Sequence, residues 1–393
     1  MIDLFKKISN YFITPIGTFH SPFEHIARDG KLERLINKGN YFHDKKQYYL
    51  AIEQYSAAIE LNPKDFTSYY HRAVTYFYLD NFEATILDAS KILELKPKYL
   101  NAYYYLSIAQ CRLNDHQAAL ETTLKALSID TKYAFTYSAR ASIQEAMGDY
   151  EAALNNLDKA VQLLNTNAYI YNQRGHTQLY LKNYAAAIQD FNQALDLDVE
   201  HVSAYINRGC TYIRLGEHDA AALDDFNQAI SIDSSDYLGY YNRGVTYYRF
   251  EKIEAALSDY NKVIALNPDY SPAYVSRGFL KAKFLENYSG ALKDYNHVIH
   301  SEHSSKEDLE DTYFNRALLR TKLEDIEGGI QDYSKMIELN PASVVAYNNS
   351  AYLKNKLKDY QGAILDCNQA IELDAQYAYA YNNKGYAQFK LGD

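Results

Sequence analysis

The chain of 393 residues has no tryptophan, only seven prolines and only three cysteines. Cys111, Cys210 and Cys367 lie far apart in the sequence. Their odd number and wide spacing argue against a disulfide framework and a cysteine-based zinc site, and they favour a reducing compartment. We therefore expect a cytoplasmic protein.

Positive charge is also in deficit. The chain has 50 acidic side chains and 40 Lys and Arg side chains, which gives a formal net charge of −10. A general nucleic-acid surface needs a basic excess, so we expect no nucleic-acid partner.

Long apolar runs are missing too, since no stretch approaches the roughly 20 residues that span a bilayer. Near the N-terminus, Leu4, Ile8 and Tyr11 follow the spacing of an amphipathic helix that ends before Pro15. We expect residues 1–31 to form a segment that caps the elements after it. Attachment to a membrane surface through residues 2–13 is the alternative.

Motifs for chemistry are absent as well. No glycine-rich phosphate loop, zinc-binding helix motif or nucleophile elbow occurs. The stretch "HVIHSEHSS" groups His297, His300 and His303, but its spacing is unspecific for a metal site. We predict no catalytic residue, no metal and no cofactor, and hence a protein that is not an enzyme.

What the chain has in abundance is tyrosine, with 41 residues, and a recurring pentapeptide such as "YYNRG" at 240–244. The small residue that ends each copy serves as an anchor, and most anchors lie 34 residues apart. The anchors are Gly39, Ala73, Ser107, Ala141, Gly175, Gly209, Gly244, Gly278, Ala317, Ala351 and Gly385. A fixed period of this length is the signature of a repeat architecture.

Each repeat reads as two helices joined by a short turn. A second small residue, such as Ala256, follows the anchor by 12 or 13 positions, and an aromatic such as Tyr260 stands four residues later. Several units close on proline, as in "IALNP" at 264–268, which stops one helix before the next begins. Small residues at these positions let the helices approach closely, and the aromatics fill the space between them.

This pattern resembles the tetratricopeptide repeat (TPR) family over residues 32–393. One copy of the family pattern runs through Tyr240, Arg243, Gly244, Tyr247, Ala256, Tyr260, Val263 and Pro268. The resemblance implies an all-α, right-handed superhelical solenoid of antiparallel helix pairs, with about ten repeats and a final helix. The first helix of each pair would line a concave groove. A spacing of 39 between Gly278 and Ala317 predicts an extended connection at 300–311, between repeats 8 and 9.

An arginine directly before the anchor predicts an ion pair inside the repeat. In most repeats an acidic residue follows this arginine by 16 or 17 positions on the second helix, as Asp259 follows Arg243. Guanidinium and carboxylate suit bidentate pairing. A ladder of arginines that binds phosphate is the alternative.

Two further positions predict a binding surface on the first helices. Asparagine recurs two residues before the anchor and could pair with a peptide backbone through its amide, although a solvated polar position is the alternative. Lys or Arg recurs five residues after the anchor in six successive repeats. These cations could form a row along the groove, which we call the basic lane, or they could only complement the helix dipole. The predicted groove residues are Asn207, Asn242, Asn315, Asn349, Arg249, Lys283, Lys322 and Lys356.

These patterns predict a scaffold for protein–protein interaction that binds an extended acidic peptide segment of another protein in the concave groove. The alternative is a targeting or regulatory TPR module of a larger enzyme that continues beyond residue 393. The chain ends on "KLGD", within a repeat, which is the observation behind this alternative.

Overall fold

The computed structural model describes residues 30–216 and 219–392, and within these ranges it contains 21 α-helices and no β-strand. The described chain divides into two compact units, an N-terminal unit of residues 30–216 and a C-terminal unit of residues 219–392. The predicted N-terminal capping segment lies outside the described residues except for Gly30 and Lys31, which begin the first helix.

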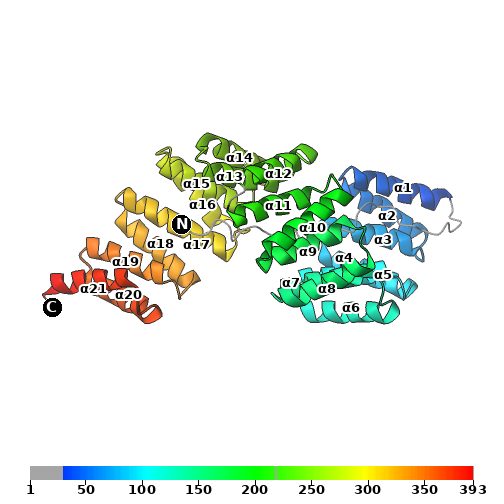
Figure 1. Cartoon of the computed structure of the whole chain (residues 1–393), viewed down its shortest axis with the longest axis horizontal. Coiled ribbons are helices and arrows are strands. Elements are labelled where there is room, and N and C mark those ends of the chain that lie inside the picture. The colour runs from blue at the N-terminus through cyan, green and yellow to red at the C-terminus, as the bar shows by residue number, and fades with distance from the viewer. Residues whose placement is uncertain (1–29, 217–218, 393) are drawn as a thin grey trace. The chain divides into compact units, whose positions relative to one another are not determined.

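The helices follow one another as the repeat predicts (Figure 1). The N-terminal unit contains α1 (Gly30–Asp44), α2 (Tyr48–Leu61), α3 (Phe66–Tyr78), α4 (Phe82–Leu95), α5 (Leu100–Arg112), α6 (His116–Ile129), α7 (Ala134–Ala146), α8 (Tyr150–Leu163), α9 (Ala168–Tyr180), α10 (Tyr184–Leu197) and α11 (Val202–Leu215). The C-terminal unit contains α12 (Asp219–Ile232), α13 (Tyr237–Arg249), α14 (Ile253–Leu266), α15 (Ser271–Lys283), α16 (Tyr288–His300), α17 (Lys306–Lys322), α18 (Ile326–Leu339), α19 (Val344–Lys356), α20 (Tyr360–Leu373) and α21 (Ala378–Leu391). Within each unit, each helix packs on the next one along the chain, which confirms the all-α solenoid of helix pairs.

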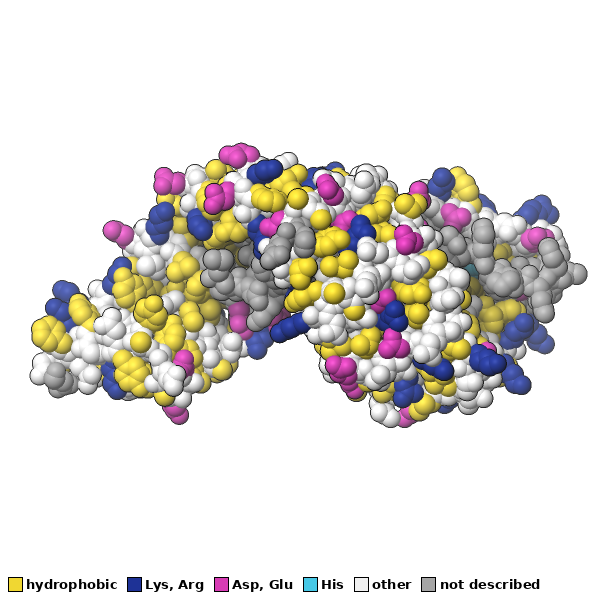
Figure 2. All heavy atoms as spheres, viewed as in Figure 1, with side chains coloured by type: hydrophobic (Ala, Val, Ile, Leu, Met, Phe, Trp, Pro, Cys, Tyr) yellow, Lys and Arg dark blue, Asp and Glu magenta, His cyan; other side chains and the backbone are white. Residues whose placement is uncertain are grey.

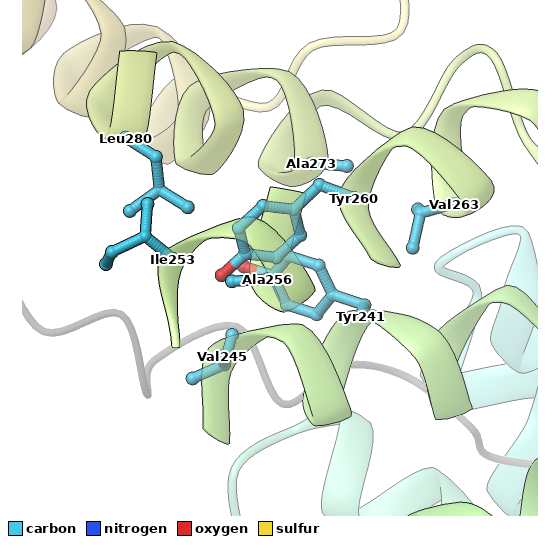
Figure 3. Close-up of a cluster of buried hydrophobic side chains, with 8 residues drawn as sticks. All are labelled: Tyr241, Val245, Ile253, Ala256, Tyr260, Val263, Ala273 and Leu280. Carbon is cyan, nitrogen blue, oxygen red and sulfur yellow. The ribbon is translucent and has the colours of Figure 1, made fainter. Parts of the chain in front are cut away.

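Small and aromatic residues pair across the two helices of a repeat, as predicted. A Cβ atom at Gly244 would lie 2.9 Å from Cε1 of Tyr260 and 3.2 Å from Cβ of Asp259, so only glycine lets the ring lie this close. Tyr260 is 1% exposed and its ring lies near that of Tyr241, with Ala256 beside them (Figure 3). The tyrosine-rich composition therefore reflects the filling of the space between closely packed helices.

The turn inside each pair has a recurring backbone conformation. One residue of this turn has a positive φ in nearly every repeat, for example Asp80 at 55°, Lys182 at 63° and Lys358 at 64°. Gly148 takes the same place in the fourth repeat with φ of 80°. The left-handed region is favourable for glycine and costs free energy for lysine, so most repeats accept some strain at this turn.

The connection between repeats 8 and 9 differs from the predicted extended segment at 300–311. The non-helical part is only residues 301–305, because α17 starts at Lys306 and has 17 residues. Ser305 and Asp308 form a capping box, in which each side chain bonds the backbone N–H of the other, so the extra residues lengthen the helix. Ser304 Oγ also donates to Val298 O at 2.7 Å and lies 2.8 Å from Ser271 Oγ.

Candidate functional site

The arginine before the anchor binds the second helix of its own repeat, which confirms the predicted ion pair. In the seventh repeat, Arg243 Nε and Nη2 donate to the two carboxylate oxygens of Asp259 at 2.9 and 2.8 Å. The guanidinium also lies 5.4 Å from the ring centroid of Tyr240. Arg72, Arg174, Arg277 and Arg316 bind Asp88, Asp190, Asp294 and Asp332 in the same bidentate way.

The same arginine has a second function that the sequence analysis missed. Arg243 Nη1 donates to Oδ1 of Asn227 on α12, which belongs to the preceding repeat, at 2.8 Å. The equivalent acceptors for the other arginines are Ser56, Asp158, Asn192, Asn261 and Asn296. The arginine thus links three helices. Each of its three guanidinium nitrogens donates inside the scaffold, which disfavours the alternative of a phosphate-binding arginine ladder.

Burial governs the electrostatics of these pairs. Asp88 is 5% exposed, and this burial raises its pKa above the ordinary value, although Arg72 acts in the opposite direction. The desolvation of a buried ion pair offsets much of the attraction between its charges, so the net contribution of such a pair to stability is small. The removal of one partner alone would nevertheless leave an unpaired buried charge.

Repeats 3 and 4 lack the carboxylate and use amides instead. Thr122 Oγ1 donates to Gln110 Oε1 at 2.8 Å, and Asn156 Nδ2 donates to Gln144 Oε1 at 2.7 Å. Arg140 remains in the fourth repeat, but its repeat has Asn156 in place of the acid and Leu124 in place of the acceptor on the preceding repeat. Arg140 therefore lacks both partners, and within residues 30–216 it forms no ion pair.

The four predicted groove asparagines have unequal surroundings. Asn207 is 3% exposed and its Nδ2 donates to Asn172 Oδ1 at 3.0 Å, so its amide is used inside the stack of the N-terminal unit. Asn349 Nδ2 donates to the hydroxyl of Tyr333 at 3.3 Å. Asn242 and Asn315 are half-buried and donate to main-chain carbonyls of their own helices, Leu238 O and Asp311 O.

These bonds limit the four asparagines to different degrees as partners for the two-point capture of a peptide that the sequence suggested. Each of the four amide nitrogens donates one of its two N–H groups inside the protein, so at Asn242 and Asn315 the carbonyl oxygen and one N–H remain for a ligand. A helical wheel of one helix could not reveal this, because the covering residues belong to the neighbouring repeat or to the backbone of the preceding turn.

The predicted basic lane is exposed on the C-terminal unit. Lys283, Lys322 and Lys356 are exposed, and none of them has an ion pair with a residue of the described ranges. Arg249 differs, because its Nε donates to Asp219 Oδ2 at 2.9 Å. Charges of both signs are interspersed over the face drawn in Figure 2.

Each lysine of the lane lies over an aromatic ring. Lys283 Nζ is 5.1 Å from the centroids of both Phe279 and Phe284. Lys322 Nζ is 4.8 Å from the ring of Tyr288, and Lys356 Nζ is 5.0 Å from that of Tyr352. Cation–π contacts of this kind hold an ammonium group in place while it stays available to an anion.

The histidine stretch has ordinary partners. The ring of His297 stacks on Tyr274 with centroids 4.0 Å apart, and His300 Nδ1 lies 2.6 Å from Asn296 O. Within the described residues, no group of His, Cys, Asp and Glu side chains could hold a metal ion. Cys367 is fully buried at the aromatic position of the tenth repeat, where burial raises its thiol pKa to about 11.

A membrane span needs a long and largely apolar helix, and this requirement bears on the described helices. None of them combines the length and the apolar character needed to cross a bilayer. The predicted attachment through residues 2–13 lies outside the described residues.

Comparisons with known proteins agree with the repeat. Models described as TPR repeat or tetratricopeptide repeat match residues 39–80, 136–164, 172–237, 237–270, 310–343 and 344–377. Together these matches cover more than half of the chain. The protein belongs to the tetratricopeptide repeat family.

Solved structures show the same fold at low sequence identity. The human IFIT1 dimer with m7Gppp-AAAA is 14% identical, with a TM-score of 0.63 over 92% of this chain and 90% of that one. A monomeric mutant of IFIT1 with Gppp-AAAA gives a TM-score of 0.64 over 92% of this chain and 91% of that one, again at 14% identity. At this identity the likeness establishes the fold alone. No curated protein matches the chain.

Proposed function

We propose that the protein is a non-enzymatic scaffold that binds an extended acidic peptide segment of another protein along the first helices of its C-terminal unit. The observation that carries this proposal is the set of exposed lysines on α15, α17 and α19, each held over an aromatic ring and without an ion pair within residues 219–392. In a chain with net charge −10, such a row of cations favours an acidic partner.

The neighbouring positions supply the rest of a peptide surface. Each amide nitrogen of Asn242 and Asn315 donates one N–H to its own helix, so the carbonyl oxygen and the second N–H are the groups that would bind a peptide backbone in this proposal. Tyr352 is 46% exposed beside Lys356 and offers contact area at low entropic cost. Asn207 and Asn349 support the scaffold in this proposal, because their amides bond to residues of the neighbouring repeats.

The test is the affinity of the full chain for a fluorescent peptide of Glu and Ser residues, against the same peptide with Gln for Glu. Replacement of Lys283, Lys322 and Lys356 by Gln should weaken binding of the acidic peptide by about tenfold, because each exposed charge contributes up to roughly 1 kcal/mol. It should also reduce the dependence of binding on salt.

A matched control removes the same charge elsewhere on the unit. Lys262, Lys293 and Lys335 lie exposed on the second helices α14, α16 and α18. Their replacement by Gln should leave binding close to that of the parent. Equal losses in both triple variants would mean that net charge alone attracts the peptide, and the lane would not be the site.

A further inference from the structure

A pocket of about 290 Å³ lies between α19, the first helix of the tenth repeat, and the final helix α21. Its lining residues are Tyr352, Asn355, Lys356, Asn382, Asn383 and Tyr386. This volume is at the lower end of the roughly 300–1,000 Å³ of small-ligand sites, so it suits one or two residues of a peptide. Hydrophobic side chains are prominent on the surface around α19 and α21 (Figure 2).

One of the residues that line the pocket, Asn355, has a buried acceptor that lacks a donor. Asn355 is 6% exposed, and its Nδ2 donates to the backbone oxygen of Asn383 at 3.0 Å. This bond fixes the orientation of the amide, so the atom left over is Oδ1. Within the described chain, this buried Oδ1 has no hydrogen-bond partner. A buried acceptor without a donor destabilises the fold, and a ligand N–H would remove that penalty.

The outer part of the pocket is cationic and aromatic. Lys356 is exposed, with Nζ 5.0 Å from the ring centroid of Tyr352. Tyr352 is 46% exposed and Tyr386 is 49% exposed. Lys390 lies over the ring of Tyr386 at 5.5 Å, so a lysine stands beside the tyrosine on each of the two helices. An anionic group is favoured here, whereas a donor is needed at Asn355.

The neighbouring repeats do not reproduce this combination. The positions equivalent to Asn355 in repeats 7, 8 and 9 hold Tyr248, Ala282 and Thr321. Thr321 Oγ1 donates to Ala317 O of its own helix at 2.8 Å. The pairing of an unsatisfied acceptor with a nearby lysine is therefore specific to the end of the lane on α19 and α21, among the repeats of the C-terminal unit.

We propose that this pocket selects an acidic residue of the bound peptide, whose backbone N–H donates to Asn355 Oδ1 and whose carboxylate faces Lys356. This inference rests on the proposed function and adds a fixed point to it. The lane alone would let a peptide bind in several registers along the lysines. One pocket with a buried acceptor would fix a single register of the bound peptide. The carboxylate is supplied either by an Asp or Glu side chain or by a free chain terminus.

Binding of two peptides to the full chain separates these sources. Both contain Glu residues, but one is acetylated and amidated at its ends and the other has a free C-terminus. Equal affinities identify the side chain as the carboxylate, and tighter binding of the free peptide identifies the terminus. In both cases Asn355→Leu should weaken binding about three- to tenfold, through the loss of one hydrogen bond.

A second variant and a chemical probe keep the test decisive. Lys356→Gln changes an exposed side chain, so it should leave the fold intact and weaken binding by a similar factor. Methylation of the single peptide N–H that enters the pocket should remove the effect of Asn355→Leu while Lys283→Gln still weakens binding. If Asn355→Leu and Lys356→Gln both bind like the parent while Lys283→Gln does not, the pocket proposal fails and the lane stands. If the parent shows no preference for the acidic peptide, the proposed function itself fails.

Discussion

Lys354 Nζ lies 2.6 Å from Oδ2 of Asp366, in a repeat that has Ser350 where most others have arginine. Ser350 Oγ donates to the same carboxylate oxygen at 2.7 Å. In this repeat, the cation that pairs with the second helix thus lies one helical turn after the usual arginine position on the first helix. What the repeat requires at this point is a positive charge on a largely buried carboxylate, and either position can supply it.

Replacement of Lys354 by Met should destabilise α19 and α20 by about 1–3 kcal/mol, because Asp366 then keeps only the Ser350 hydroxyl. The control is Lys281→Met. Lys281 Nζ is 2.8 Å from Asp294 Oδ2, but Asp294 also has the bidentate bond from Arg277, so the loss should be smaller. Hydrogen exchange of the two helices measures the local effect. Equal losses in the two variants would show that the second cation acts independently of the arginine.

The bridge made by Arg243 gives a second prediction. Arg243→Leu leaves Asp259 buried and unpaired, and should cost roughly 3–5 kcal/mol. The double variant with Asp259→Thr copies the natural pair Leu106 and Thr122 of the third repeat, and should recover most of that stability. Denaturant titrations of the parent, both single variants and the double variant give the coupling energy. Additive effects would contradict a direct pair.

The contact from Arg243 to Asn227 extends this prediction to the neighbouring repeat. Asn227→Ala removes the acceptor on α12 but leaves the pair with Asp259 intact. It should therefore cost less, about 0.5–1.5 kcal/mol, and its effect on hydrogen exchange should be concentrated in α12 and α13. If hydrogen-exchange protection decreases only in α13 and α14, then Arg243 Nη1 does not link the two repeats.

The turn inside each pair allows a stabilising substitution. Lys182 has φ of 63°, and Gly148 occupies the equivalent place in the preceding repeat. Lys182→Gly should stabilise the protein by up to about 1 kcal/mol, since glycine has no steric cost at positive φ and the gain exceeds its entropic cost. Gly148→Lys is the reverse change and should destabilise by a similar amount. Thermal denaturation compares the two, and shifts of the same sign would contradict the argument.

The sequence predicted the helix pairs, the small and aromatic positions and the Arg–Asp pair, because these depend on contacts inside a repeat of fixed length. It did not predict contacts between repeats. The signal for one of them was present, since a polar residue such as Asn227 precedes the arginine by 16 positions and Leu124 stands there before Arg140. The burial of Asn207 and the lengthening of α17 had no such signal, because both depend on how neighbouring repeats cover a helix face or continue a helix. The bonding pattern at Asn355 likewise needs both α19 and α21 in place.

The last prediction concerns a buried carboxylate of the N-terminal unit. Glu145 on α7 is 9% exposed, and its Oε1 accepts a hydrogen bond from the hydroxyl of Thr177 on α9. Its Oε2 has no hydrogen-bond partner within the described residues. Burial raises the pKa of this carboxyl from 4.5 to about 7, and the hydrogen bonds from Thr177 and Gln173 only partly offset that shift. The folded chain therefore holds a proton that the unfolded chain has already lost between these two pH values.

The sign of the effect follows from this difference in bound protons. The contribution of Glu145 to stability is complete below about pH 4.5, is lost as the pH rises, and is gone above about pH 7. The full loss is about 3 kcal/mol, at roughly 1.4 kcal/mol per pKa unit. Glu145→Gln keeps the acceptor for Thr177 without a charge, so it should flatten this slope and be more stable than the parent above pH 7. Glu121→Gln, at an exposed position on α6, is the control and should keep the slope of the parent. Denaturant titrations across this pH range measure the slopes, and a slope in Glu145→Gln equal to that of the parent would show that another group causes it.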